Sequence, residues 1–229
     1  MIQPERLRWL NDEPVRAGRF VLLWIQAAQR AGCNHALEHA IDRANELALP
    51  LVAVFGLTEA FPEANERSYA FMLEGLAGLS RRLADRGVQL VLRCGALPDA
   101  VLPLVEDAAL VVADMGYLRI QCAWRRQLAK QASRRVEQVE TDAIVPVETA
   151  APREAYAAAT LRPRIHRLLP RFLVPLRPRG LRKDSLGLRF DGLDLRNHET
   201  LLDALSIDRS VRRVATFAGG VDEALDRRE

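Results

Sequence analysis

The sequence predicts an α/β protein built on a parallel sheet of five or more strands, with helices on both faces. Two observations lead to this fold class. Short runs of uninterrupted apolar residues recur along the chain, which is typical of strands that are buried on both sides. Each run is followed by apolar residues at every third or fourth position, the spacing of a helix with one buried face. Strands that alternate with helices favour parallel pairing through right-handed crossovers.

The first strand and helix set the pattern for the elements that follow. Residues 20–25 are apolar throughout, and apolar residues return at helical spacing from Ala36 to Leu47. Gly87 stands where the long second helix is expected to stop. Further strands are predicted at residues 51–57, 88–93 and 109–113 and within 136–145. The other predicted helices span residues 69–83, 98–106 and 118–131.

This alternation covers residues 19–147. Residues 1–18 are polar and are interpreted as a lead-in to the first strand. Residues 148–229 contain many prolines and glycines, so we expect a long connector with short helices and little core of its own. Within it, residues 197–205 and 220–228 look like helix starts. The second of these breaks off as if another domain followed.

Positive charge is concentrated in the last third of the chain. Residues 1–150 carry 17 basic and 19 acidic side chains (17 − 19 = −2), whereas residues 151–229 carry 16 and 11 (16 − 11 = +5). Nearly all of the basic residues there are arginines, which bind phosphates and carboxylates alike. We therefore favour an interdomain linker for the arginine series within residues 162–182. Binding of a nucleic acid backbone stays open as the alternative.

The sequence also bears on location and on cysteine chemistry. No apolar run is long enough to span a membrane, and residues 1–14 lack the pattern of a signal peptide. We therefore predict a cytoplasmic protein without membrane contacts. Cys33, Cys94 and Cys122 are odd in number and share no metal-type spacing, so buried, inert thiols are expected.

Common catalytic and phosphate-binding motifs are missing from the sequence. There is no glycine-rich phosphate loop, no dinucleotide-type glycine triplet and no serine nucleophile elbow. The string from His35 to His39 matches an inverted zinc-protease motif, with two histidines one helical turn apart. Because no third ligand can be identified, we interpret this string as helix surface and predict no metal site.

Two groups of carboxylates are candidates for chemistry. Glu137, Glu140 and Asp142 are close in sequence, but such residues near a sheet edge are usually solvated, which we favour over a catalytic cluster. Asp114 ends an apolar strand, where side chains of parallel sheets face ligands. A cap for the next helix is the alternative, and the sequence leaves both open. The tryptophans are interpreted as core or packing residues: Trp24, Trp9 and Trp124.

Nearly the whole chain carries one ordered set of short motifs. They begin at residues 23–26, 29–30 and 34–38 and continue at 44–47, 50–51, 55–57, 64–67, 69 and 71–76. They end at residues 114, 116–119, 124–125, 142, 145–147 and 160–165. In this order the motifs closely resemble class II DNA photolyases, the flavoproteins that repair cyclobutane pyrimidine dimers.

The resemblance implies a Rossmann-like photolyase N-terminal α/β domain followed by the interdomain linker. In such enzymes a helical C-terminal domain binds FAD, flips the dimer out of the duplex and donates an electron from the photoreduced flavin. This sequence resembles only the entry to that domain, at residues 217–225. We therefore expect no catalytic residues, no FAD and no repair from these residues alone. The implied partners are a missing or separate FAD-binding helical domain and, only through it, damaged DNA.

The half of a photolyase that this chain resembles holds a light-harvesting antenna in some members, 8-hydroxy-5-deazaflavin. By location, the resemblance places the antenna among Gln26, Phe55, Leu57, Arg67, Asp114 and Tyr117. Aromatic and apolar side chains would sandwich a flat ring, while Asp114 and Arg67 fix its polar edge. Two alternatives stay open. The cleft is filled by its own side chains, or the chain is a stand-alone small-molecule or nucleotide-binding module of the same fold.

Overall fold

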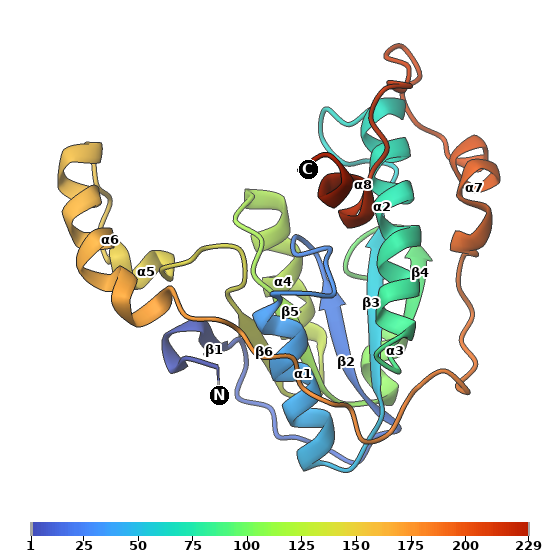
Figure 1. Ribbon diagram of the computed structural model, residues 1–229. Coiled ribbons are helices and arrows are strands. Elements are labelled where there is room, and N and C mark those ends of the chain that lie inside the picture. Colours follow the sequence, from blue (N-terminus) through green and yellow to red (C-terminus); the bar gives the residue numbers. More distant parts are fainter. Residues whose placement is uncertain (1, 229) are drawn as a thin grey trace.

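The computed structural model describes residues 2–228 and confirms the α/β fold (Figure 1). Its six strands form one sheet in the order β1-β6-β5-β2-β3-β4, and every neighbouring pair except β1 and β6 is parallel. The strands are β1 (Leu7–Trp9), β2 (Phe20–Ile25), β3 (Leu51–Leu57), β4 (Gln89–Cys94), β5 (Ala108–Asp114) and β6 (Val136–Val139).

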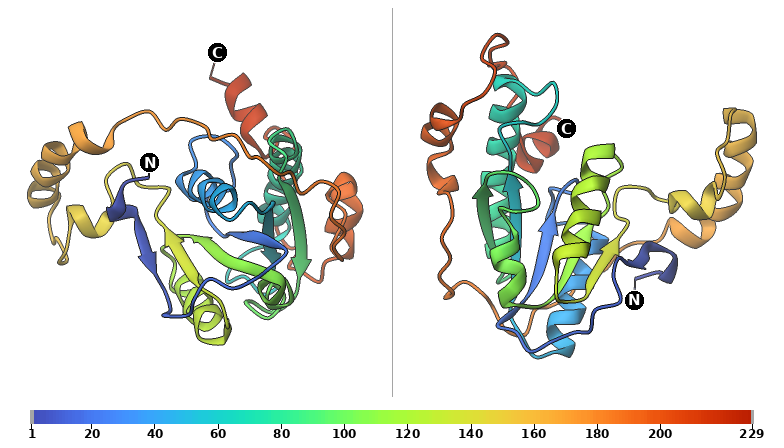
Figure 2. Two further views of the ribbon diagram at one scale, coloured as in Figure 1. Left: turned by 90° about the horizontal axis from the view of Figure 1, so that it is seen from below. Right: turned by 180° about the vertical axis from the view of Figure 1, so that it is seen from behind.

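Helices cover both faces of this sheet, as predicted (Figure 2). One face packs against α1 (His35–Glu46) and α2 (Glu66–Ala84), and the other against α3 (Leu102–Asp107) and α4 (Arg119–Gln131). Gly87 follows α2 with a φ of 74°, a left-handed conformation that favours glycine where a helix stops.

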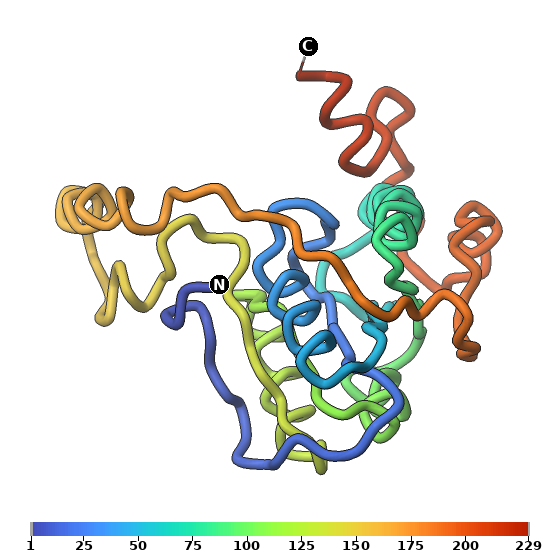
Figure 3. The backbone as a smooth tube through the Cα atoms, turned by 60° about the horizontal axis from the view of Figure 1, so that its bottom comes forward, coloured from blue at the N-terminus to red at the C-terminus, as the bar shows by residue number. Residues whose placement is uncertain are grey.

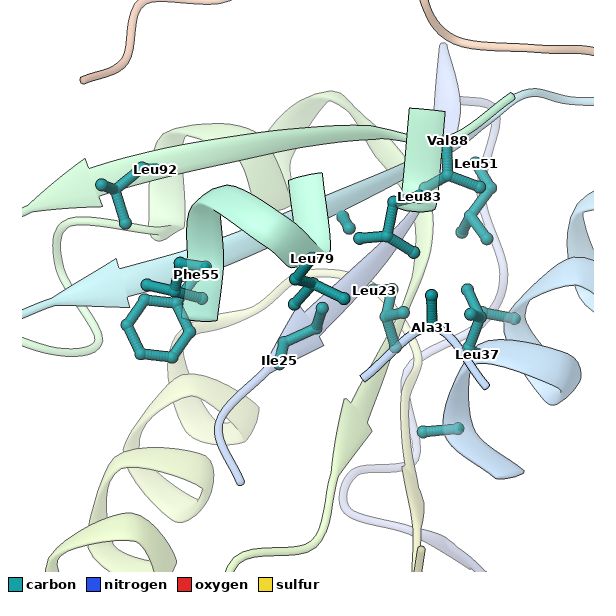
Figure 4. Packing of buried hydrophobic residues seen from close by; sticks show 14 of the residues in the cluster. Leu23, Ile25, Ala31, Leu37, Leu51, Phe55, Leu79, Leu83, Val88 and Leu92 are labelled. Atoms are coloured by element: carbon teal, nitrogen blue, oxygen red, sulfur yellow. The ribbon is translucent and has the colours of Figure 1, made fainter. Parts of the chain in front are cut away.

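The central strand β2 explains why its apolar run does not alternate. Val21, Leu23 and Ile25 pack toward α1 and α2, whereas Phe20, Leu22 and Trp24 pack toward α3 and α4. Figure 4 shows the first of these layers, with Leu23 and Ile25 beside Leu37 of α1 and Leu79 and Leu83 of α2. All six side chains of β2 are 2% exposed or less, so both faces of the strand need apolar residues.

The structure corrects the interpretation of residues 1–18 as a lead-in. These residues contain a 3₁₀ turn, Pro4–Arg6, and the short strand β1, which pairs antiparallel with β6. Trp9 at the end of β1 is 64% exposed, with the Arg135 guanidinium 4.5 Å from the centre of its ring. A three-residue strand with an exposed face has no apolar period, so pairing with β6 rather than sequence pattern determines it.

Beyond the sheet, the chain continues into a helical arm. It consists of α5 (Val147–Ala150) and α6 (Ala158–Phe172), which project away from the sheet in Figure 1. A small cluster of Val145, Ala150 and Phe172 holds the arm together. Helix α6 is longer than the short helices we expected, although Pro163 and Pro170 lie within it.

After the arm, residues 176–195 form an extended segment that we call the strap. It runs across α1 toward the far side of the sheet, as the tube in Figure 3 shows. Glu38 and Arg86 form a buried ion pair, with 2.8 Å between Oε1 and Nη1, and both bind the strap. The backbone N–H of Arg179 donates to Glu38 at 2.6 Å, and Arg86 donates to the Arg179 carbonyl at 3.1 Å.

The far end of the strap lies along β4. The buried Ser185 hydroxyl donates to the Leu51 carbonyl at 2.6 Å, and the Leu193 N–H donates to the Leu92 carbonyl at 2.9 Å. The last elements are a 3₁₀ turn (Leu195–Asn197), α7 (His198–Ala204) and α8 (Val221–Asp226), which confirm both predicted helix starts. Within residues 2–228, no helix combines the length and the apolar character needed to cross a membrane.

Candidate functional site

Asp114 ends β5 as predicted, but its carboxylate serves the protein's own backbone. It is 1% exposed and accepts hydrogen bonds from the backbone N–H groups of Gln26, Ala27 and Ala28, at 2.6, 2.9 and 2.6 Å. Burial raises the pKa of Asp114 to about 6, although the three N–H donors act in the opposite direction. Asp114 therefore holds the loop after β2 in place instead of capping the next helix.

A cavity of about 440 Å³ lies at the carboxyl ends of β2 and β3, between the start of α2 and α4. This is the position where open parallel sheets bind ligands. Most of its wall is aromatic or aliphatic, contributed by Trp24, Ile25, Phe55, Leu57, Phe61, Tyr69, Met72, Leu97 and Trp124. Polar groups are fewer, and they include Gln26, Gln121 and Ser68.

Three of the six predicted antenna residues line this cavity, namely Gln26, Phe55 and Leu57. The other three, Arg67, Asp114 and Tyr117, are not part of its wall. Arg67 is exposed, and its Nε donates to the Arg212 carbonyl at 3.2 Å. The Tyr117 hydroxyl donates to Glu140 at 2.7 Å, so it too is directed to a protein partner.

Sequence reasoning did not predict the part of the wall that comes from α4 and from the loop after β3. Trp124, interpreted as a packing residue, lies edge-on to Phe61 with 6.1 Å between ring centres, and both line the cavity. Phe61 stands alone in a polar loop of the sequence. That isolation is the signal that indicates a role other than core packing.

The polar side of the wall is organised by Arg125, which is 3% exposed. Its guanidinium donates to Gln26 Oε1 at 2.8 Å, to Gln138 Oε1 at 2.8 Å and to the Gly116 carbonyl at 2.7 Å. Burial lowers the pKa of Arg125 from its usual value. Cys122 Sγ accepts from the same guanidinium at 3.4 Å, so three neutral oxygens and one sulfur hold a buried cation directly behind the cavity wall.

The predicted solvated state of the carboxylates after β5 is wrong for two of the three. Glu137 and Glu140 are 5% and 4% exposed. Glu137 lies 2.7 Å from His39 Nε2, while Glu140 accepts from the Val147 N–H and from Tyr117, both at 2.7 Å. Asp142, by contrast, lies at the surface. Because basic and N–H partners from other elements surround the first two, burial does not leave them unpaired.

The histidine string lies at the start of α1 as predicted. His39 pairs with Glu137, and His35 has its pKa lowered to about 4, mainly by burial and further by Arg6 and Arg30. Among residues 2–228, no group of three or more histidines, cysteines or carboxylates is arranged to hold a metal ion. The interpretation of the string as helix surface is wrong for its middle, because Ala36, Leu37 and Glu38 are buried. The cysteines are not buried as expected: Cys33 and Cys94 are exposed, and Cys122 is half-buried.

The fold and the cavity together define the class of protein: an α/β domain with an aromatic pocket at the carboxyl edge of a largely parallel sheet. The sequence profile of the DNA photolyase family matches residues 21–180. The chain therefore belongs to the DNA photolyase family. This confirms the resemblance at the level of the family.

Curated relatives support this membership. The chain is 49% identical to the deoxyribodipyrimidine photo-lyase of Methanothermobacter thermautotrophicus, over 82% of this chain and 42% of that protein. It is 30% identical to the enzyme of the same name from Arabidopsis thaliana, over 76% and 36% of the two chains. The chain thus spans about two fifths of the length of the curated relatives that it matches.

Solved structures show the same fold. A class III photolyase from Agrobacterium tumefaciens superposes with a TM-score of 0.62 at 18% identity, over 80% of this chain and 38% of that one. A photolyase from Sulfolobus tokodaii, solved with two FAD molecules, gives 0.65 at 14% identity over 90% and 45%. At these identities the likeness shows that the α/β architecture is that of photolyase structures.

Proposed function

We propose that residues 1–229 are the N-terminal, antenna-carrying part of a class II cyclobutane pyrimidine dimer photolyase, an enzyme of light-dependent DNA repair. The observation that carries the proposal is the aromatic cavity of about 440 Å³, in a chain 49% identical to a deoxyribodipyrimidine photo-lyase. The ordered motifs that resemble class II enzymes support the choice of class. A cytoplasmic location is part of the same proposal.

The proposed ligand of the cavity is 8-hydroxy-5-deazaflavin, a flat chromophore. A volume of this size is typical of small-molecule sites, and flat aromatic walls favour a ring system over a flexible chain. Phe55, Leu57 and Trp124 would contact the ring faces, and Gln26 would contact a polar edge. Asp114 acts through the loop that carries Gln26. Arg67 and Tyr117 lie outside the cavity wall and would contact only a ligand that extends beyond the cavity.

The repair step itself is proposed to depend on the part of the longer relatives that these residues do not match. That part would supply FAD, the pocket for the flipped dimer and the contacts with damaged DNA. We therefore expect no dimer cleavage from residues 1–229 by themselves. Light-dependent repair by the purified chain without an added flavin domain would contradict this part of the proposal.

The test is an ultraviolet and visible spectrum after incubation with 8-hydroxy-5-deazaflavin or with FAD, followed by desalting. Retention of deazaflavin near one equivalent, without FAD, is the expected result. Retention of FAD alone would replace the proposed antenna with a second flavin, as in the Sulfolobus tokodaii structure. Retention of neither would remove the antenna function from this chain.

A stand-alone small-molecule or nucleotide-binding module is the second candidate function. The observation that favours it is that every residue of the cavity wall lies between Trp24 and Trp124, so no other domain is needed to form the cavity. The two candidates differ in the DNA that follows the coding sequence. Continuation in frame, or after one frameshift, into a flavin-domain sequence supports the photolyase, whereas a stop followed by an unrelated gene supports the module.

A further inference from the structure

The buried Arg125 determines how the amide of Gln26 is oriented. A guanidinium has five N–H donors and no acceptor, so any amide that binds it must offer its oxygen. Gln26 does so at 2.8 Å, and Gln138 does so on the other side of the same guanidinium. Within residues 2–228, no carboxylate forms an ion pair with Arg125, so these two amide oxygens are its main side-chain partners.

This orientation leaves the Gln26 amino group without a partner. Gln26 lines the cavity and is 9% exposed, and its Nε2 is buried without a hydrogen-bond acceptor among the described residues. Buried polar groups in folded proteins almost always have partners, and one that has none in the protein is available to a ligand. The amide cannot turn over to relieve this, because it would then point a donor at Arg125.

A second amide in the wall is held by its oxygen. Gln121 is 8% exposed, and its Oε1 accepts from the Leu118 N–H at 3.2 Å. Its amide lies directly over Gly116, where an added Cβ would come within 2.2 Å of Oε1. Gly116 is therefore needed at this position, because any larger residue would displace the Gln121 amide.

From these contacts we propose that Gln26 presents a fixed N–H donor to the cavity, which selects a flat aromatic ligand that carries a hydrogen-bond acceptor on the facing edge. Arg125 is the positioning residue that fixes the Gln26 amide. Carbonyl oxygens on a fused heteroaromatic ring have the matching chemistry. The inference rests on the cavity being the ligand site of the proposed function, and it adds the specificity of that site.

Two dyes of the same shape test this selection. Lumichrome and 2,3-dimethylphenazine share three fused rings and two methyl groups, but only lumichrome carries carbonyl oxygens. We expect the protein to bind lumichrome more tightly by about tenfold or more, the effect of one or two hydrogen bonds. The two dissociation constants are measured by fluorescence titration. Equal affinity for the two dyes overturns the inference.

Two glutamine-to-glutamate variants separate the loss of the Gln26 N–H donor from the effect of an added negative charge beside Arg125. In Gln26→Glu a carboxylate still accepts from Arg125 but replaces the Nε2 donor with an acceptor, so the preference for lumichrome is expected to disappear. Gln138→Glu places the same charge on the other side of Arg125, away from the cavity wall, and the preference is expected to remain. A preference that survives in Gln26→Glu, or is lost equally in both variants, contradicts the assignment of Gln26.

The positioning role of Arg125 has its own readout. Arg125→Lys cannot hold both amides in a fork, so the dye preference is expected to fall while affinity for dimethylphenazine stays within twofold. Affinity for both dyes falling together would indicate a general loss of structure, and Arg125 would then not be a specificity residue. Circular dichroism of each variant checks that the fold is present.

The outcome can be told apart from failure of the proposed function. A lumichrome preference in a protein that does not retain deazaflavin supports the Gln26 donor and removes the antenna function. Retained deazaflavin with no preference between the dyes supports the antenna function and removes the proposed role of the Gln26 donor. Binding of neither dye and no retained deazaflavin overturns both.

Discussion

The two halves of the sheet's carboxyl edge differ in what their side chains contact. At β5 and β6, which we call the polar half, the polar side chains form hydrogen bonds with other protein groups. Asp114 holds the loop at residues 26–28, and Glu140 binds Tyr117 and Val147. At β2 and β3, which we call the open half, the edge forms a cavity lined mainly by aromatic and aliphatic groups. Asp114 of the polar half holds the loop that contributes Gln26 and Ala27 to the wall of this cavity. At β5 and β6, unlike at Gln26 after β2, the polar residues therefore support the cavity wall without lining it.

The largest effect that tests this comparison is expected from Asp114→Ala. Three buried N–H groups would lose their acceptor, which destabilises the protein by about 3–5 kcal/mol. Urea unfolding followed by circular dichroism measures the change. Asp142→Ala is the control, because its ion pair with Arg30 lies at the surface and should change stability by about 1 kcal/mol or less. A loss of similar size in both variants would contradict the supporting role of Asp114.

The pH dependence of stability gives the next largest effect. The pKa of Asp114 is raised to about 6 in the fold, above its ordinary value of 3.8, so the folded state holds the proton more tightly than the unfolded chain does. Its contribution to stability is therefore greatest below pH 3.8, falls as the pH rises to 6 and is level above that. The difference over this window is about 3 kcal/mol, from about 1.4 kcal/mol for each pH unit.

Asp114→Asn isolates this contribution, because its side chain does not titrate. Relative to that variant, the unmodified protein should lose stability between pH 4 and pH 6 and remain constant between pH 6 and pH 8. Urea midpoints at several pH values test the expectation. A difference between the two proteins that does not change with pH would mean that Asp114 titrates normally.

A large side chain that fills the cavity in the open half is expected to weaken ligand binding with little effect on stability. Ser68 is exposed and lines the cavity, whereas the neighbouring Arg67 is exposed and does not. Ser68→Trp should lower deazaflavin retention by about tenfold or more, and each substitution should change stability by about 0.5 kcal/mol or less. Arg67→Trp is the matched control, with retention unchanged. Loss of retention in Arg67→Trp would return Arg67 to the site and redraw the boundary between the two halves.

The smallest effect is expected from Tyr117→Phe on the polar half. Its hydroxyl donates to Glu140, which keeps a second donor in the Val147 N–H, so we expect a loss of about 1 kcal/mol. Ligand retention should be unchanged. Thermal unfolding with and without deazaflavin measures both quantities. A change confined to the liganded protein would place Tyr117 in contact with the ligand.

The sheet was predictable because strands that are buried on both faces have uninterrupted runs of apolar residues in the sequence. Strands β2, β3 and β5 are buried along their whole length, and their apolar runs indicate them almost to the residue. β1 was not predicted, since it has only three residues, and the side chains of Arg8 and Trp9 are exposed. The pairing of β1 with β6 depends on tertiary structure, which a local pattern does not contain.

The cavity lies at the predicted edge of the sheet, but only three of the six predicted residues line it, and its use by an antenna stays a prediction. Strand ends indicate which residues reach the carboxyl edge, which is why Gln26, Phe55 and Leu57 could be placed there. They do not indicate which way a polar side chain turns, and the backbone donors of Asp114 lie more than 80 residues away in sequence. Trp124 was not assigned to the wall because one face of α4 supplies both core and cavity residues.

The strap determines how short this protein can be made. With the short β1 covering β6, and residues 185–193 bonded along Leu51 and β4, neither β6 nor β4 presents a bare row of backbone donors and acceptors. Uncovered strands of this kind pair with other chains and aggregate. A protein shortened to residues 19–147 would lose both covers at once. Its failure to stay monomeric in solution would then reflect exposed strand edges, and soluble shortened forms should retain the chain from about residue 2 to beyond Leu195.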